Sequence, residues 1–93
     1  MAEPAPATIR LDKWLLYARL CKSRTLAQAL VEAGGVRVNR ILATKPGHAL
    51  HQGDVLTVAR GGQVLVLRLL GIPLRRGPAT EARLAYEEIP PAA

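Results

Sequence analysis

The sequence contains few aromatic residues and almost no cysteine. It has no phenylalanine, one tryptophan and two tyrosines, so its core must be built mainly from aliphatic side chains. The single cysteine, Cys21, excludes an internal disulfide and argues against a thiolate metal site. We expect Cys21 to act as a small hydrophobic residue in a protein of a reducing compartment.

The residues that enzymes commonly use are also scarce. The only histidines, His48 and His51, fall in a segment without regular pattern, and no two acids are spaced to bind a metal or to hold unequal pKa values. No glycine-rich stretch joins a strand to a helix in the way that nucleotide-binding loops require. We therefore predict no enzymatic activity, no metal, no cofactor and no small-molecule substrate.

Long apolar segments are missing as well. The most apolar run, VLVLRLLGI, is nine residues long and contains Arg68, which is too short and too polar to span a bilayer. The first eight residues, MAEPAPAT, carry an acid and two prolines instead of the basic and apolar pattern of a secretion signal. We predict a disordered lead-in over residues 1–8, no membrane association and a cytoplasmic location.

Positive charge is what the sequence has in excess. Thirteen Lys and Arg against seven Asp and Glu give a net charge of +6, and the segment from Arg10 to Lys45 holds eight bases and two acids. From Glu81 onward the acids outnumber the bases. A localised excess of this kind is typical of proteins that bind a polyanion, either a nucleic acid or an anionic membrane. A charged face that serves only solubility is the alternative.

The first half of the chain has the apolar spacing of two helices. Residues 9–20 are expected to form a helix capped by Thr8, and residues 24–33 a second one capped by Ser23 and ended by Gly34 and Gly35. The short joint between them, residues 21–22, requires the helices to pack against each other at a steep angle. The expected buried face of the second helix is Leu26, Ala29, Leu30 and Ala33, and its expected outward row is Arg24, Gln28 and Glu32.

The second half of the chain has the period of strands. Residues 36–39 alternate apolar and polar side chains, a short strand is expected near Ile41 and Leu42, and residues 55–59 and 64–70 should form a hairpin that turns at Gly61-Gly62. A last short helix is expected within residues 79–88. The fold class is α+β, in which the two helices pack against a small, mainly antiparallel sheet. The predicted domain spans residues 9–72, and residues 73–93 form a basic connector, a short helix and a flexible tail.

Two groups of residues have the chemistry of an RNA-binding surface. Lys22, Ser23 and Arg24 stand at a helix start, where positive charge is unfavourable unless an anion such as a phosphate is bound there. The alternative is that both cations extend into solvent. Arg10, Lys13 and Tyr17 align on the first helix, with Trp14 beside them as either a stacking residue or part of the core.

Further polar side chains extend the predicted surface. Arg37 and Asn39 share one strand face, and Gln28 adds a hydrogen-bonding group from the second helix. Arg75 and Arg76 either enlarge the surface or belong to a solvated turn.

Three stretches in order, RLDKWL, KSRTLAQALVEAGGVRVN and KPGHALHQGDVLTV, resemble the S-four RNA-binding domain, which is named for a small-subunit ribosomal protein. The resemblance covers residues 10–58 and implies an L-shaped motif, two helices and a strand, that docks on structured RNA. This chain has Arg40 where such domains usually have glycine. The resemblance implies RNA contacts by Arg10, Lys13, Trp14, Lys22, Ser23, Arg24, Gln28, Arg37, Asn39 and Lys45.

The stretch RRGPATEARLAYEE is similar to the fifteen-kilodalton heat-shock protein family, whose members associate with the ribosome. This implies a partner in the large ribosomal subunit and a role in the rescue or recycling of stalled subunits under heat stress. We expect a monomer. DNA binding by a helix-turn-helix-like arrangement, and a protein adapter that uses its basic face, are the alternatives.

Overall fold

A five-stranded antiparallel sheet with the order β3-β2-β5-β6-β7 forms one layer of the fold. The computed structural model describes residues 8–73 and 75–90. The predicted lead-in, apart from Thr8, and the end of the predicted tail lie outside the described residues. The sheet strands are β2 (Val36–Val38), β3 (Ile41–Leu42), β5 (Val55–Arg60), β6 (Gln63–Leu69) and β7 (Tyr86–Glu88).

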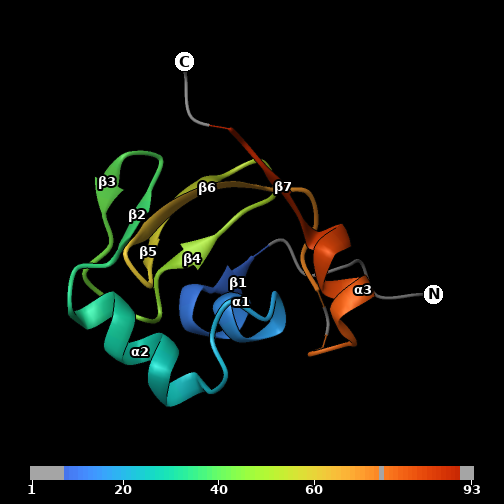
Figure 1. The fold of residues 1–93 in the computed structure, drawn as a ribbon, viewed down its shortest axis with the longest axis horizontal. Helices are drawn as coiled ribbons and strands as arrows, with labels where there is room; N and C mark the ends of the chain where they lie inside the picture. The colour runs from blue at the N-terminus through green and yellow to red at the C-terminus, as the bar shows by residue number, and fades with distance from the viewer. Residues whose placement is uncertain (1–7, 74, 91–93) are drawn as a thin grey trace.

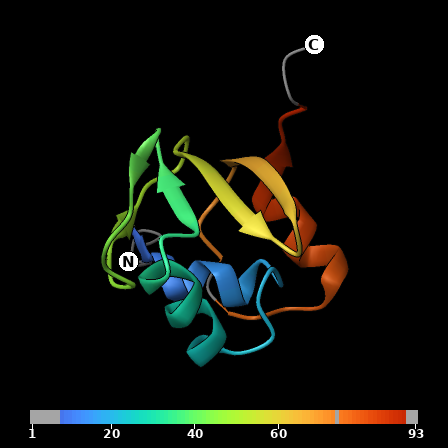
Figure 2. The same cartoon turned by 60° about the vertical axis from the view of Figure 1, so that its left-hand side comes forward.

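The second layer consists of two helices on one face of this sheet (Figures 1 and 2). They are α1 (Leu11–Tyr17) and α2 (Arg24–Glu32), and a two-stranded sheet of β1 (Ile9–Arg10) and β4 (Ala49–Leu50) lies beside α1. The short helix α3 (Ala79–Ala82) and the 3-10 turn η1 (Arg83–Ala85) precede β7. This confirms the α+β class and the packing of the two N-terminal helices.

The core between the layers is aliphatic apart from one tryptophan, as the composition predicts. From the helices it takes Leu11, Trp14, Leu15, Ala27 and Val31, all nearly or completely buried. The inward-facing positions of the sheet strands supply the opposite wall: Val36, Val38, Leu56, Val58, Leu67 and Leu69. Because inward and outward positions alternate along a strand, Arg37 lies on the face of the sheet that points away from the helices.

Helix α1 is shorter at both ends than its apolar spacing predicts. The predicted cap at Thr8 is wrong, because Ile9 and Arg10 pair with Leu50 and Ala49 as a strand, and the helix begins after Arg10. Its end is fixed by Arg19, which has a φ of 61°. The amides of Arg19 and Leu20 donate to Leu16 and Leu15, at 3.1 and 3.0 Å, which closes the helix and turns the chain toward α2.

Helix α2 has the predicted bounds to within one residue, and its cap is confirmed. The Ser23 hydroxyl accepts a hydrogen bond of 3.1 Å from the Leu26 amide, and Gly34 ends the helix with a φ of 81°. The predicted buried face is wrong. Leu26 is 53% exposed, whereas Ala27 and Val31 are buried, because the polar row of the helix turns toward α1.

The two hairpins of the sheet have two-residue turns with left-handed backbone conformations. Gly61 and Gly62 join β5 to β6 with φ of 53° and 79°, as predicted. Asn39 and Arg40 join β2 to β3 with φ of 50° and 72°. Asn39 therefore belongs to a turn and not, as predicted, to the strand face that holds Arg37.

The segment 86–88 is a strand rather than part of the predicted last helix. It pairs with the free edge of β6, with Tyr86 opposite Leu69 and Glu88 opposite Leu67, while helical structure is confined to residues 79–85. Strands β1 and β4 have only two residues each, and β7 exposes both Glu87 and Glu88, so none of the three has a readable alternation. Within the described ranges, no helix has the length and apolar character needed to cross a membrane.

A substitution at Gly35 tests the close packing where α2 passes into β2. A Cβ atom there would lie 2.5 Å from Leu30 Cδ1 and 3.0 Å from the Leu30 carbonyl oxygen. We expect Gly35→Ala to lower the free energy of unfolding by about 1–2 kcal/mol because backbone or side chain must shift. Gly71→Ala is the matched control, since a Cβ there meets no atom within 4 Å. Equal unfolding midpoints in urea for both variants would contradict this packing.

Candidate nucleic-acid interface

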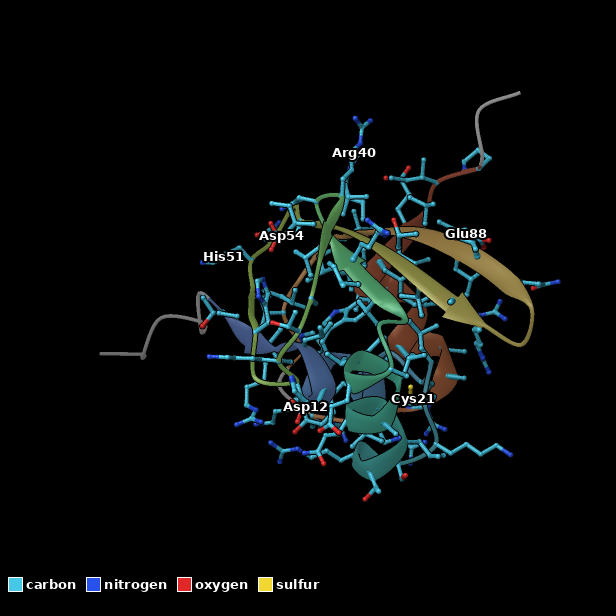
Figure 3. All side chains as sticks on the ribbon, turned by 90° about the vertical axis from the view of Figure 1, so that its left-hand side faces the viewer. Asp12, Cys21, Arg40, His51, Asp54 and Glu88 are labelled. Carbon is cyan, nitrogen blue, oxygen red and sulfur yellow. The ribbon has the colours of Figure 1, made fainter. Side chains whose placement is uncertain are left out.

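The polar contact between the two helices is centred on one buried carboxylate, Asp12. Its side chain has no exposed surface although it lies on the second residue of α1, next to solvated cations. The side chain points toward α2 (Figure 3), which contributes two of its partners. A buried carboxylate is tolerated only where hydrogen bonds and opposite charges replace its lost water.

Both oxygens of Asp12 are fully used. Oδ1 accepts from Arg10 Nε at 3.1 Å and from the Lys13 backbone amide at 2.8 Å. Oδ2 accepts from Arg10 Nη2 at 3.2 Å, Arg24 Nε at 3.2 Å and Gln28 Nε2 at 3.1 Å. The set Arg10, Asp12, Arg24 and Gln28, called the Asp12 cluster below, therefore joins the end of β1, the start of α1 and the first two turns of α2.

The donors decide the charge state of Asp12. Burial by itself raises the pKa of the carboxyl, but the hydrogen bonds from Arg10, Gln28, Arg24 and the Lys13 amide outweigh it and lower the pKa to about 2. The carboxylate is therefore ionised at neutral pH, and with two arginines around it the cluster carries a net charge of +1.

The two arginines of the cluster are oriented yet accessible. The Arg10 and Arg24 side chains remain 51% and 47% exposed. Arg24 uses only Nε toward Asp12, so its two terminal amino groups are directed elsewhere. A guanidinium held on one side by a carboxylate presents its remaining N–H groups in a fixed direction, which suits a phosphate oxygen.

The start of α2 lies beside this cluster. Ser23 uses its hydroxyl to satisfy the Leu26 amide, so the amides of Arg24 and Thr25 are the first-turn donors that a helix leaves without an internal partner. Lys22 is exposed immediately before them. The predicted group of Lys22, Ser23 and Arg24 is thus brought together, although Arg24 already has an anionic partner within the protein.

The segment before β4 adds Lys45 to the same side of the molecule. The amides of Leu11 and Asp12 donate to the carbonyls of His48 and Pro46, at 2.9 and 3.0 Å, so this segment caps α1. A Cβ atom at Gly47 would lie 3.4 Å from Arg10 Cζ, which shows how closely the segment approaches the Arg10 guanidinium. The exposed Lys45 therefore stands near the Asp12 cluster.

Lys13 and Tyr17 form a further part of the predicted row on α1. The Lys13 ammonium lies 5.6 Å from the centre of the Tyr17 ring, within the range of a cation–π contact. With Arg10, Ile72 and Pro73 they line a cavity of about 370 Å³. A second cavity, of about 360 Å³, shares Tyr17, Ile72 and Pro73 with the first and extends to Arg75.

Trp14 was predicted as an RNA contact, and this is wrong. The side chain has no exposed surface and packs edge-on against Tyr86, with ring centres 6.0 Å apart and an angle of 70° between the planes. A completely buried ring cannot stack on a base. Its Nε1 is buried without a hydrogen-bond partner among the described residues, a cost that the apolar contacts of the ring offset.

The surface predicted as one continuous patch is divided in two. Arg37 is exposed on the face of the sheet that points away from α1 and α2. Asn39 is occupied within its turn, where its side chain donates to Asp54 and accepts from the Val55 amide. Gln28 is occupied by Asp12. On the helix side, contacts connect Arg10, Arg24 and Gln28 through Asp12, and Lys13 with Tyr17. Lys22 and Ser23 stand at the start of α2, and Lys45 stands before the α1 cap.

The connector between β6 and α3 contributes Arg75 to the edge of the helix side. Arg75 borders the cavity that includes Tyr17, but its charge is offset by Glu81 at 3.4 Å. Arg76 is exposed beside it. An additional arginine, Arg19, fixes the connector by donating from Nε to the Gly77 carbonyl at 2.8 Å.

Sequence reasoning missed Asp12, the centre of the cluster. The available signal was weak: Asp12 is one of only two acids in the basic segment from Arg10 to Lys45, and it lies next to the apolar stripe of α1. Its side-chain partners are 2, 12 and 16 residues away along the chain, so local spacing does not reveal them.

Among residues 8–73 and 75–90, side chains with catalytic or metal-binding chemistry include one His–Asp pair, in which His51 Nδ1 lies 3.8 Å from Asp54 Oδ2. No three His, Cys, Asp or Glu side chains there are close enough to bind a metal ion. Cys21 is half-buried and lies in the joint between the helices, and burial raises the pKa of its thiol, which disfavours the reactive thiolate.

Acid should weaken the helix junction because Asp12 has a lowered pKa. Its stabilising contribution is complete above the ordinary value of 3.8 and is lost as the pH falls toward about 2. We expect the free energy of unfolding to fall by about 2 kcal/mol from this group over that interval. Asp12→Asn should remove that part of the pH dependence in urea titrations. If the variant and the wild type lost the same stability between pH 4 and pH 2, Asp12 would not be the titrating group.

Comparison with known proteins assigns the chain to a family. The family model described as "S4 domain" matches residues 9–56, which include α1, α2 and β2 to β4. A heat shock protein 15 homolog of Aeromonas salmonicida is 40% identical over 90 residues, 95% of this chain and 67% of that protein. An "RQC P-site tRNA stabilizing factor" of Listeria monocytogenes is 39% identical over 62 residues, 67% of this chain and 66% of that protein.

A solved structure agrees with the fold. Heat shock protein 15 of Vibrio cholerae has a TM-score of 0.83 and 36% sequence identity, covering 88% of this chain and 82% of that one. That structure is described as trimeric, so it lends no support to the expected monomer. The chain spans about two thirds of the length of the curated relatives that it matches. On these matches the chain belongs to the S4 RNA-binding domain family and, within it, to the non-catalytic heat shock protein 15 family.

Proposed function

We propose that this protein binds structured RNA of the large ribosomal subunit through the Asp12 cluster, the start of α2 and the neighbouring Lys13, Lys22 and Lys45. The observation that carries the proposal is the buried Asp12, which holds Arg10 and Arg24 in place while about half of each side chain stays exposed. Arginines that serve only solubility gain nothing from being fixed, since a free side chain retains its rotamer entropy.

The electrostatics of this side favour phosphate. Asp12 neutralises one of the two arginine charges, and Lys13, Lys22 and Lys45 add positive charge to this side. A phosphate at the start of α2 would receive the Arg24 and Thr25 amides and the Arg24 amino groups together. Backbone contacts of this type recognise the shape of an RNA element more than its sequence.

The cavity beside α1 suits a sugar or a base rather than a further phosphate. Tyr17, Ile72 and Pro73 supply apolar walls, and Arg10 and Lys13 stand at its side. Aromatic side chains bind RNA by stacking on unpaired bases, which loops and bulges of structured RNA provide.

The names of the relatives support a place on the ribosome. One is a heat shock protein, and another is named as a factor that stabilises a P-site tRNA. We infer a role in the rescue of large subunits that retain a tRNA with an unfinished chain. This role rests on family analogy, and the cationic helix side is the surface that we propose to contact the RNA.

The alternative of DNA recognition by α2 is disfavoured by the geometry. A recognition helix needs outward polar side chains that reach base edges in the major groove. Here Arg24 and Gln28 are turned toward Asp12, and the next residue in that row is the acidic Glu32. No side-chain row of α2 remains that would read a duplex.

The test removes two cations whose side chains form no hydrogen bond or ion pair among the described residues, although the Lys13 ammonium contacts the Tyr17 ring. Lys13→Ala with Lys22→Ala should weaken binding of large-subunit ribosomal RNA by about 10-fold and reduce the salt slope by about 1–2, because each lost phosphate contact contributes about 0.7–0.9. Binding is measured by titration at several salt concentrations, with duplex DNA of equal length as competitor.

The matched control removes the same charge elsewhere. Arg68→Ala with Arg83→Ala also lowers the net charge by two, but Arg68 faces Glu87 and Arg83 lies in η1. We expect a clearly smaller loss of affinity for this control. Equal losses in the two double variants would mean that net charge alone governs binding, and parity between RNA and DNA would refute RNA recognition.

A further inference from the structure

The turn between β2 and β3 contains a residue that is poorly suited to its backbone conformation. Both turn residues are left-handed, with φ of 50° at Asn39 and 72° at Arg40. Asparagine adopts this conformation readily, and glycine is the favoured second residue of such a turn. An arginine there crowds its Cβ against its own backbone, so Arg40 is held at an energetic cost.

Hydrogen bonds hold the turn in this conformation, so it cannot relax to relieve that cost. The Asn39 amide donates to the Val55 carbonyl at 2.7 Å, and the Val55 amide donates to Asn39 Oδ1 at 3.0 Å. Asn39 Nδ2 donates to Asp54 Oδ1 at 3.1 Å, while Asp54 Oδ2 accepts from the His51 amide at 2.8 Å. These bonds hold the tip of the hairpin against the turn that precedes β5.

The side chains of Arg40 and Ile41 at this tip are exposed to solvent. Arg40 reaches away from the ribbon at the end of the view opposite Asp12 (Figure 3), and it forms no hydrogen bond or ion pair within the described part of the chain. The neighbouring Ile41 is 73% exposed. A rigid tip that displays a cation and an apolar side chain at a conformational cost points to an external partner.

The charge of the hairpin indicates which partner it is. Residues 36–45 contain Arg37, Arg40 and Lys45 and no acid. The chain runs from the tip through β3 to Lys45 and to the cap of α1, where Arg10 lies. Asp54 also lies beside this tip, where it accepts hydrogen bonds from Asn39 and from the His51 amide. The exposed cations Arg40, Lys45 and Arg10 follow the chain from the tip to the Asp12 cluster, and this matches a polynucleotide backbone better than a protein surface.

We infer that Arg40 and Ile41 form a second RNA contact, separate from the Asp12 cluster, in which the guanidinium binds a phosphate and the isoleucine packs on a sugar or base. This rests on the proposed function, since it extends RNA binding to the far end of the same edge. An RNA element that binds both the Asp12 cluster and the pair Arg40 and Ile41 must be long enough to extend along the β2–β3 hairpin.

The decisive variant is Arg40→Gly, because folding and binding should respond in opposite directions. Glycine fits the left-handed position, so the melting temperature should rise by about 2–6 °C. Affinity for large-subunit ribosomal RNA should fall by about 3- to 10-fold, with a reduction of the salt slope by about 0.7–0.9. Arg83→Ala is the control for the lost charge and should leave affinity nearly unchanged.

Ile41, the apolar part of the contact, can be tested separately from Arg40 because its loss should change affinity but not the salt slope. Ile41→Thr should weaken RNA binding by about 2- to 5-fold without changing the salt slope, because no charge is removed. Val64→Thr is the matched control, since Val64 is 66% exposed on β6, just after the Gly61-Gly62 turn of the other hairpin. Val64→Thr should leave affinity unchanged.

The outcomes separate this inference from the proposed function. If the wild type binds ribosomal RNA and Arg40→Gly binds it as tightly with the same slope, the second contact is wrong and the first stands. The same conclusion follows if Ile41→Thr and Val64→Thr behave alike. If the wild type itself shows no preference for ribosomal RNA over duplex DNA, both the proposed function and this inference fail.

Discussion

A single buried carboxylate determines how the cationic side of this protein is built. Asp12 accepts hydrogen bonds from Arg10, Arg24, Gln28 and the Lys13 amide, and these donors come from a strand and two helices. A carboxylate in an apolar junction is stable only while all of them are in place. These hydrogen bonds therefore fix the position of α2 relative to α1 and the directions of the Arg10 and Arg24 side chains. The stability of the junction and, on the proposed function, RNA recognition depend on the same five hydrogen bonds.

The rest of the fold supplies the frame for that junction. The left-handed Arg19 ends α1 after seven residues and directs a short joint into α2, so the two helix starts can share one acid. The carbonyls of Pro46 and His48 cap α1 and bring Lys45 near Arg10. The sheet packs against the other side of the helices through a small aliphatic core. Arg10, Lys13 and Arg24 are therefore placed by a strand and two helices, and Lys45 by the segment that caps α1, which would lower the entropy lost if RNA binds there.

Local rules predicted the parts of this structure that local interactions decide. The Ser23 cap and the Gly61-Gly62 turn could be anticipated because each depends on neighbours within four residues. The unfavourable charge of Arg24 at a helix start predicts a bound anion such as a phosphate, whereas the anion that Arg24 contacts in the structure is Asp12 of the same protein. That pairing, and the burial of Trp14, depend on how the helices pack, which periodicity alone cannot fix.

The binding of RNA by Asp12→Asn tests the central claim most directly, because two accounts predict opposite signs. The substitution raises the net charge from +6 to +7, so attraction by charge alone would tighten RNA binding. If Asp12 orients Arg10 and Arg24 for phosphate, the variant should bind large-subunit ribosomal RNA more weakly, by about 5- to 20-fold, under conditions where circular dichroism shows it folded. Equal or tighter binding by the folded variant would contradict the account.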